Sequence, residues 1–313
     1  MVPVIMITER SEVRVFAPAT LANLGCGYDV LGLAIYGPGD EIVLRKCDGA
    51  SGITVTQITG DEGKLPLAAD QNTAAIAAQA VLDELMIEGA FEMEIHKKMP
   101  FGSGLGSSAA SAVGGAFAMN ELLGSPLERR QLLPAAMAGE AVASKAWHAD
   151  NVAPGLLGGV CLVRDNPTLD VVSLPAPDDL WMTVLYNPAV EILTSEARQK
   201  VPTEVSTHTA TTQAGHLAAF VSALYERDYA LLSRTTVDHI AEPGRSELIP
   251  QFEFYRERAL KAGALSFGIS GSGPSLFALS QGEVGAHLVA QEFADDPVEV
   301  YVSQINTDGV STL

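Results

Sequence analysis

The chain is poor in cysteine and in charge, and each scarcity excludes a class of protein. Its 313 residues include three cysteines, Cys26, Cys47 and Cys161, and no two of them have CxxC spacing. Such a set favours reduced thiols in a cytoplasmic protein over a disulfide framework or a structural zinc site. Charged residues make up 18% and hydrophobic residues 47%, which is typical of a globular protein and not of a disordered one.

Basic residues are half as numerous as acidic ones, 19 against 38, which gives a net charge of -19. An acidic surface repels nucleic acid and anionic lipid, so we expect neither as a partner. Residues 1–7 are apolar but too few for a secretion signal. The uncharged stretch 99–120 contains proline, glycine and serine, which argue against a membrane helix. We therefore expect a cytoplasmic protein that does not enter a membrane.

One glycine-rich segment stands out between a strand-like run at 91–97 and an alanine-rich helical run at 109–123. Its residues are Pro100, Phe101, Gly102, Ser103, Gly104, Leu105, Gly106, Ser107, Ser108, Ala109 and Ala110. The three glycines let the backbone turn with its N–H groups aimed at an anion, and the helix adds its positive dipole end. We interpret the segment as a phosphate cradle; the alternative is a tight turn before a buried helix.

The remaining pattern predicts α+β architecture and no doubly wound sheet. Strands are predicted at 13–17, 40–46, 53–58, 91–97, 160–164, 182–186, 265–269, 276–279 and 298–302. Helices are predicted at 72–85, 109–123, 125 to about 146, 193–200, 211–226, 229–240, 246–262 and 284–293. The helix from residue 125 rests on a capping box, Ser125-Pro126-Leu127-Glu128, and residues 37–39 and 271–273 are predicted turns. A break at 165–167 predicts two domains, 1–165 and 166–313.

Other nucleotide-binding patterns do not fit this chain. The P-loop pattern GxxxxGK[ST] and the protein-kinase motifs HRD and DFG are absent. The GxGxG of residues 102–106 lacks the acidic residue at the end of a following strand that a dinucleotide-binding fold needs. NAD binding is therefore poorly supported.

Three motifs together resemble the GHMP small-molecule kinases, the family of galactokinase, homoserine kinase and mevalonate kinase. They are PATLANLGCGYD at 18–29, PFGSGLGSSAAS at 100–111 and GISGSGP at 268–274, in the family's order. Within the family, the first and third motifs and WHADNVAP at 147–154 are most similar to the homoserine kinases. The resemblance covers essentially the whole chain. It implies an N-terminal domain like domain 2 of ribosomal protein S5 and a ferredoxin-like GHMP C-terminal domain.

The resemblance also implies a reaction, in which ATP phosphorylates the side-chain hydroxyl of L-homoserine on the way to threonine. The residues it implies at homoserine are Asn23, Asp29, His148, Thr194, Arg198 and Arg245. Asp29 would bind the ammonium group, Asn23 would add a polar contact, and the two arginines would bind the carboxylate. Taken alone, Asn23 and Asp29 fit a tight turn equally well, an arginine on a helix is most often a solvated charge, and a lone histidine is most often structural.

For the nucleotide, the resemblance implies contacts from the cradle and Asn72, with Mg²⁺ on Ser108 and Glu140. A hydroxyl and a carboxylate suit magnesium, although Glu140 alone could be solvated and Asn72 could be a helix N-cap. Thr20 stands where other members have the lysine of an Asp–Lys pair, so Asp150 is not predicted to be a base. Leu21 replaces a usual serine. We expect catalysis by positioning and electrostatics.

Two other functions stay open at this point. One is a GHMP kinase for a different alcohol, such as mevalonate or a sugar. The other is a non-catalytic member that binds a nucleotide or an acid ligand. The sequence does not set the oligomeric state, and a homodimer is left open.

Overall fold

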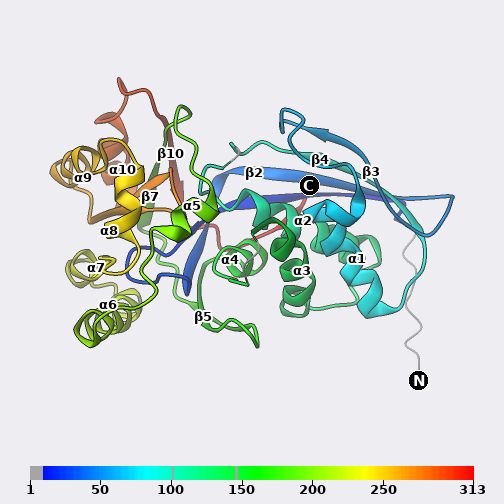
Figure 1. The fold of residues 1–313 in the computed structure, drawn as a ribbon, viewed down its shortest axis with the longest axis horizontal. Helices are drawn as coiled ribbons and strands as arrows, with labels where there is room; N and C mark the ends of the chain where they lie inside the picture. Colours follow the sequence, from blue (N-terminus) through cyan, green and yellow to red (C-terminus); the bar gives the residue numbers. More distant parts are fainter. Residues whose placement is uncertain (1–9, 101, 145–146) are drawn as a thin grey trace.

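The computed structural model describes residues 10–100, 102–144 and 147–313, which build two β-sheets with helices packed on them (Figure 1). The strands of the first sheet are β1 (Glu12–Ala22), β2 (Leu31–Cys47), β3 (Gly52–Thr59), β4 (Ala90–His96), β5 (Val160–Asp165), β6 (Asp170–Leu174) and β11 (Ser311–Thr312). Their order is β11-β1-β2-β4-β3, and β5 joins β2 to β6 beside this path. Only the β3–β4 pair is parallel among these strands.

Helix α2 (Ser107–Leu122) is the central element of the N-terminal half. It packs on β1 and β2 and against α1 (Thr73–Leu85), α3 (Leu133–Ser144) and α4 (Val152–Leu157). Small residues permit this, since a Cβ on Gly115 would lie 2.1 Å from the carbonyl oxygen of Ala74. Because the helix is buried along almost its whole length, its N-terminus is held on a rigid support.

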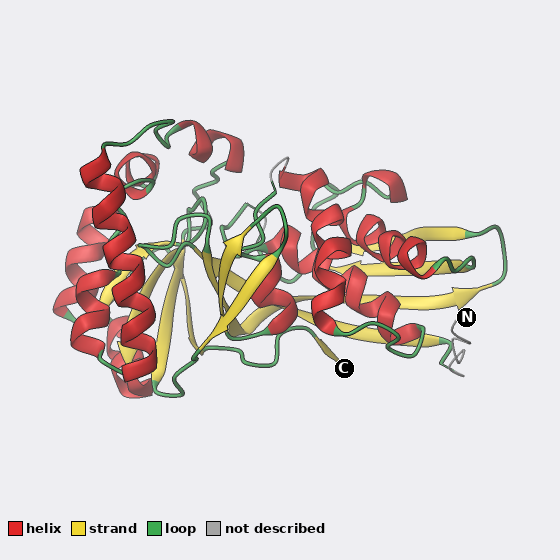
Figure 2. Cartoon of the chain, turned by 90° about the horizontal axis from the view of Figure 1, so that it is seen from below, coloured by secondary structure: helices red, strands yellow, loops and turns green. Residues whose placement is uncertain are grey.

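The second sheet has the ferredoxin-like order. Its strands are β7 (Leu180–Tyr186), β8 (Ser266–Ile269), β9 (Leu276–Gln281) and β10 (Glu299–Gln304), all antiparallel in the order β10-β7-β9-β8. With α9 (Phe252–Lys261) and α10 (Gly282–Gln291) they form a βαββαβ unit. Between β7 and α9 lie α5 (Thr194–Gln199), α6 (Thr207–Glu226), α7 (Tyr229–Thr235) and α8 (Glu242–Arg245). Figure 2 shows one group of helices over the first sheet and another beside the second.

The two halves are joined by backbone as well as by packing. Ile35 bridges to Ile305, and the amide of Asn306 donates to the carbonyl of Ala34 at 2.8 Å. The chain then returns to the first sheet, where β11 pairs with β1. The first sheet also runs past residue 165 through β6, so the boundary between 1–165 and 166–313 stays a prediction. The α+β class with two domains is confirmed.

The predicted helix start at Ser125 is wrong. Ser125 has a φ of 57° and its hydroxyl donates to Glu121 at 2.7 Å, so it ends α2 and does not begin the next helix. The capping box is formed instead by Glu128 and Gln131, and α3 begins after it, at Leu133. The predicted end near residue 146 lies outside the described residues.

Three other local predictions are also wrong. Residues 37–39 form no turn and lie inside β2. The pairing of β2 with β1 shifts register beside them, between Pro18 and Thr20. The helix predicted at 229–240 ends at Thr235, because the carboxylate of Asp238 accepts amide hydrogen bonds that open α8. The helix predicted at 246–262 begins only at Phe252. Strands β6 and β11 and helices α4 and α8 were not predicted.

The described residues contain no helix that is long and apolar enough to cross a membrane. Cys26, Cys47 and Cys161 are free thiols, and burial raises the pKa of Cys26 and of Cys161 to about 12. Two of the three thiols are therefore held protonated inside the protein and are poor nucleophiles.

Candidate active site

The glycine-rich segment forms an open cradle at the N-terminus of α2. Gly102, Gly104 and Gly106 have φ values of 60°, 77° and 68°, a backbone region that side chains disfavour. The first hydrogen bond of the helix runs from the amide of Ala110 to the carbonyl of Gly106. No described side chain caps the helix at Gly106. The amides of residues 107–109 therefore have no partner within the helix and are available to an anion, as the cradle prediction requires.

The third motif holds the cradle from the C-terminal domain. The Ser270 hydroxyl donates to the carbonyl of Gly104 at 2.7 Å, and the amide of Ser275 donates to the carbonyl of Ser103 at 3.0 Å. A Cβ on Gly104 would lie 2.6 Å from the carbonyl oxygen of Ser270. The predicted turn at 271–273 is thus in direct contact with the cradle.

A hydroxyl and a carboxylate meet beside the cradle. Ser108 lies in the first turn of α2, and its Oγ donates to Oε1 of Glu140, from α3, at 3.0 Å. Glu140 is 8% exposed and faces the same cavity. Two hard oxygen ligands at the mouth of a phosphate cradle fit Mg²⁺, which takes its other ligands from phosphates and water. The described residues contain no cluster of three His, Cys, Asp or Glu that could bind a metal.

Asn72 is the N-cap of α1. Its Oδ1 accepts from the amides of Ala74 and Ala75 at 3.1 and 3.2 Å, and its Nδ2 donates to the carbonyl of Pro66 at 3.0 Å. The side chain is therefore mostly committed to the protein, although it borders the cavity. The capping alternative raised above describes this residue, and a nucleotide contact stays a prediction.

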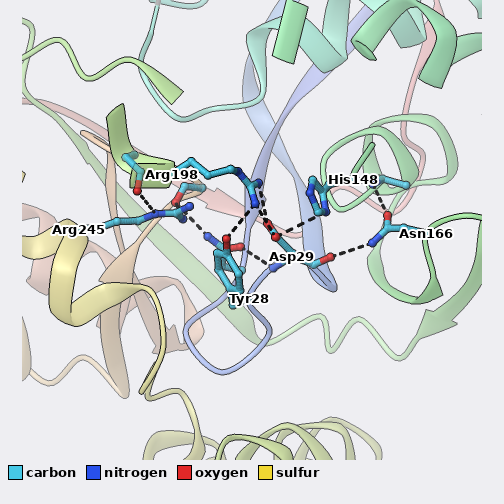
Figure 3. A network of polar contacts seen from close by, with 10 residues as sticks. Tyr28, Asp29, His148, Asn166, Arg198 and Arg245 are labelled. Atoms are coloured by element: carbon cyan, nitrogen blue, oxygen red, sulfur yellow. Dashed lines mark hydrogen bonds and ion pairs between the residues drawn. The ribbon is translucent and has the colours of Figure 1, made fainter. Parts of the chain in front are cut away.

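Asp29 lies at the centre of the opposite end of the cavity, where Figure 3 shows its contacts. The carboxylate accepts two hydrogen bonds from Arg198 of α5, at 2.9 and 3.2 Å. Nδ1 of His148 lies 3.6 Å from the same carboxylate, and burial lowers the pKa of this histidine. Asp29 and Arg198, predicted to bind opposite ends of one zwitterion, thus neutralise each other here.

The carbonyl of Gly271 links the other two predicted residues. It accepts from Nδ2 of Asn23 at 3.0 Å and from Nη1 of Arg245 at 2.7 Å. The Asn23 Oδ1 in turn accepts from the amide of Asp29. Arg245 is only 4% exposed, and burial lowers its pKa. An arginine this buried is not the solvated surface charge that a helix position alone would favour.

A single cavity of about 610 Å³ is lined by both groups. The predicted residues on its wall are Asn23, Asp29, Asn72, Gly102, Ser103, Gly104, Gly106, Ser107, Ser108, Glu140, His148, Thr194, Arg198 and Arg245. Pro100, Leu105, Ala109 and Ala110 are not among its lining residues; Leu105 and the two alanines are buried behind it and support the cradle. Phe101 lies outside the described residues.

The sequence predicted no role in the site for four residues that the structure places in this region. Lys97 and Asp40 form a buried ion pair beneath the cradle, and the lysine also donates to the carbonyl of Ser107 at 2.8 Å. Oδ1 of Asn151 accepts from the Thr20 hydroxyl at 2.8 Å. Tyr28 accepts from Arg198 at 3.0 Å. Tyr28 and Asn151 stand inside quoted motifs, whereas nothing in the sequence marks the Asp40–Lys97 pairing.

Asp150 borders the cavity but is buried. Burial, with the nearby charge of Asp29, raises the pKa of Asp150 to about 7. Thr20, in the place of a lysine, donates its hydroxyl to Asn151 and offers no positive charge to this carboxyl group. The expectation that Asp150 is not a base stays a prediction.

Comparison with known proteins identifies the family of this chain. Residues 72–159 match the GHMP kinases N terminal domain, and residues 220–297 match the GHMP kinases C terminal domain. A homoserine kinase of Chlorobium phaeobacteroides strain BS1 is 42% identical over 285 residues, covering 88% of this chain and 89% of that protein. The chain belongs to the homoserine kinases of the GHMP family.

Further relatives support this membership. A homoserine kinase of Chlorobium phaeovibrioides is 43% identical over 290 residues, covering 90% of each chain. The crystal structure of homoserine kinase from Cytophaga hutchinsonii superposes with a TM-score of 0.93 at 46% identity, covering 98% of both chains. The predicted enzyme class, a phosphotransferase with an alcohol acceptor, is confirmed, and membership of the family implies the use of ATP.

Proposed function

We propose that this protein transfers the γ-phosphoryl group of ATP to the side-chain hydroxyl of L-homoserine and releases O-phospho-L-homoserine. The observation that carries the proposal is the shared cavity. One end is a glycine cradle at a helix N-terminus, and the other is a group of opposite charges suited to a zwitterion. A donor with phosphates and an acceptor with two charged ends can therefore be held against each other.

The cradle would bind the terminal phosphates through backbone amides and the Ser107 hydroxyl, which is buried without a hydrogen-bond partner among the described residues. Ser108 and Glu140 would hold Mg²⁺, which supplies neutralising charge to the phosphates when bound. Since the protein carries a net charge of -19, local amides and cations must supply the attraction for ATP.

At the other end, Asp29 would bind the ammonium group of homoserine, and Arg198 with Arg245 would bind the carboxylate. The Asp29–Arg198 pair then opens to admit both charges of the substrate, so each protein charge exchanges one partner for another. Asn23 keeps Asp29 in place through the amide of that residue. Thr194 and His148 complete the wall of this end.

Thr20 takes the place of the lysine that pairs with an aspartate in other members of the family, so that position gives Asp150 no lysine partner. We assign no general base. The side-chain hydroxyl of homoserine loses its proton late, to a phosphate oxygen or to water, after its oxygen has reached the γ-phosphorus. Rate enhancement comes from alignment of the hydroxyl with the phosphate and from charge neutralisation at the cradle.

The experiment is a panel of alcohols in a coupled assay for ADP release. L-homoserine is compared with 4-hydroxybutanoate, which lacks the ammonium, with 3-aminopropan-1-ol, which lacks the carboxylate, and with mevalonate. We expect each truncated analogue to lose kcat/KM by about 10²-fold or more, because a charged group of the site is left without its partner. Turnover of mevalonate without turnover of homoserine would overturn the substrate assignment.

A further inference from the structure

Tyr28 lies beside both arginines of the proposed homoserine site (Figure 3). The guanidinium carbon of Arg245 is 5.1 Å from the centre of the tyrosine ring, and that of Arg198 is 6.0 Å from it. The phenol oxygen also accepts a hydrogen bond from Nη1 of Arg198 at 3.0 Å. The tyrosine is half-buried and is not part of the cavity wall, so it lies behind the charged groups that are.

We propose that Tyr28 is a positioning residue that fixes the spacing and direction of Arg198 and Arg245 for the carboxylate of the substrate. The inference rests on the proposed function and deepens it. Tyr28 does not touch the substrate. It acts through the two guanidinium groups that do.

The electrostatics of the site explain why such a residue is needed. Two guanidinium groups that converge on one carboxylate repel each other before the substrate arrives. An aromatic ring attracts cations, so a ring that both guanidinium groups approach lowers the cost of holding them together. Burial and the neighbouring Asp29 raise the pKa of Tyr28, which keeps its phenol neutral and its hydrogen on the oxygen.

The hydroxyl of Tyr28 also contacts Arg198, the cationic member of the ion pair that the substrate must open. Nη1 of Arg198 donates both to this hydroxyl, at 3.0 Å, and to the carboxylate of Asp29, at 2.9 Å. When the carboxylate of the substrate takes the place of Asp29, the hydroxyl still holds Arg198 near its starting position. The site can then open without losing its geometry.

The loop itself does not depend on the tyrosine side chain. The amide of Gly27 donates to the carbonyl of Asn23 at 2.9 Å, and the amide of Asn23 donates to the carbonyl of Leu31 at 2.7 Å. The amide of Leu31 returns to the carbonyl of Gly27 at 2.9 Å. These backbone bonds close the loop, so a substitution of Tyr28 reports on the arginines and not on loop folding.

The test compares Tyr28→Phe and Tyr28→Leu with the wild type in steady-state kinetics for both substrates. Tyr28→Phe removes the hydroxyl and keeps the ring, so we expect KM for homoserine to rise about 3- to 10-fold. Tyr28→Leu removes both, and we expect a rise of roughly 10- to 100-fold. KM for ATP should stay within about twofold, because the cradle is not touched.

Tyr36 provides a matched control. It is also a tyrosine with a hydrogen-bonded hydroxyl, which donates to the carboxylate of Asp308 at 2.9 Å, and it lies outside the cavity wall. Tyr36→Leu should leave both KM values unchanged. An unchanged KM for homoserine in Tyr28→Leu, or an equal rise in both KM values, would overturn the inference. If Tyr28→Leu does not fold, an unchanged KM in Tyr28→Phe would do so.

The outcome separates this inference from the proposed function. Failure of the wild type to phosphorylate homoserine would remove the proposed function itself. Normal turnover by the wild type, with Tyr28 variants that bind homoserine as the wild type does, would remove only the role of Tyr28.

Discussion

The contact between the cradle and the third motif can be tested with two glycines of the same loop. Gly102 and Gly104 have similar positive φ values, 60° and 77°, so alanine costs about 1–2 kcal/mol of backbone strain at either position. Their surroundings differ. Among the described residues, a Cβ on Gly102 would meet only the side chain of Glu191, at 3.5 Å, which is ordinary contact. A Cβ on Gly104 would lie 2.6 Å from the carbonyl of Ser270 and 2.8 Å from that of Gly273.

Gly104→Ala must therefore push two backbone carbonyls away, at a further cost of roughly 1–3 kcal/mol. The displaced motif contains Gly271, whose carbonyl accepts from Asn23 and Arg245 at the homoserine end. Gly104→Ala should therefore raise KM for both substrates and lower kcat/KM by about 10²-fold or more. Gly102→Ala should raise KM for ATP by less than about tenfold and leave KM for homoserine unchanged.

The assay is ADP release with each substrate varied in turn, and thermal unfolding shows that both variants are folded. Equal losses in the two variants would show that backbone strain alone governs the loop. A Gly104→Ala enzyme with normal KM for homoserine would refute the link between the cradle and the amino-acid end.

Three further predictions concern charged groups around the cavity. Glu140→Gln should raise the Mg²⁺ concentration for half-maximal activity by about tenfold or more without changing the melting temperature, and an unchanged titration would exclude it as a ligand. Lys97→Met leaves the buried carboxylate of Asp40 without its ion-pair partner, so the free energy of unfolding measured in urea should fall by about 3–5 kcal/mol. The double variant Lys97→Met/Asp40→Asn should recover part of this loss, and no recovery would contradict the pairing. Burial raises the pKa of Asp150 from 3.8 to about 7, so its stabilising contribution is complete below pH 4 and is lost as the pH rises through 7. Asp150→Asn should then be more stable than the wild type at pH 8 by about 2–4 kcal/mol and no more stable at pH 4, and equal pH profiles would contradict this.

The cradle could be predicted because its chemistry is local. Three glycines, two serines and a following helix lie within one short segment, and backbone geometry follows from the residue types. The central strands and helices were also predictable, since alternating strands and apolar helices leave a clear pattern. Ser125 shows the limit of such patterns. The same capping residues can end one helix or begin the next, and only the partner, Glu121, decides which.

The homoserine end was not predictable from local pattern. Asp29 and Arg198 are 169 positions apart, and their meeting depends on how the C-terminal domain packs on the loop after β1. The family motifs identified the residues but not their pairing. Tyr28 and the buried Asp40–Lys97 pair carry no local signal of their contacts, because both depend on partners from distant elements.

The most direct test of the central claim is a crystal structure with a non-hydrolysable ATP analogue, Mg²⁺ and L-homoserine. We expect the terminal phosphates on the amides at the N-terminus of α2, beside Ser108 and Glu140. We expect the homoserine carboxylate on Arg198 and Arg245. A nucleotide bound elsewhere, with the tip of α2 bare, would contradict the account.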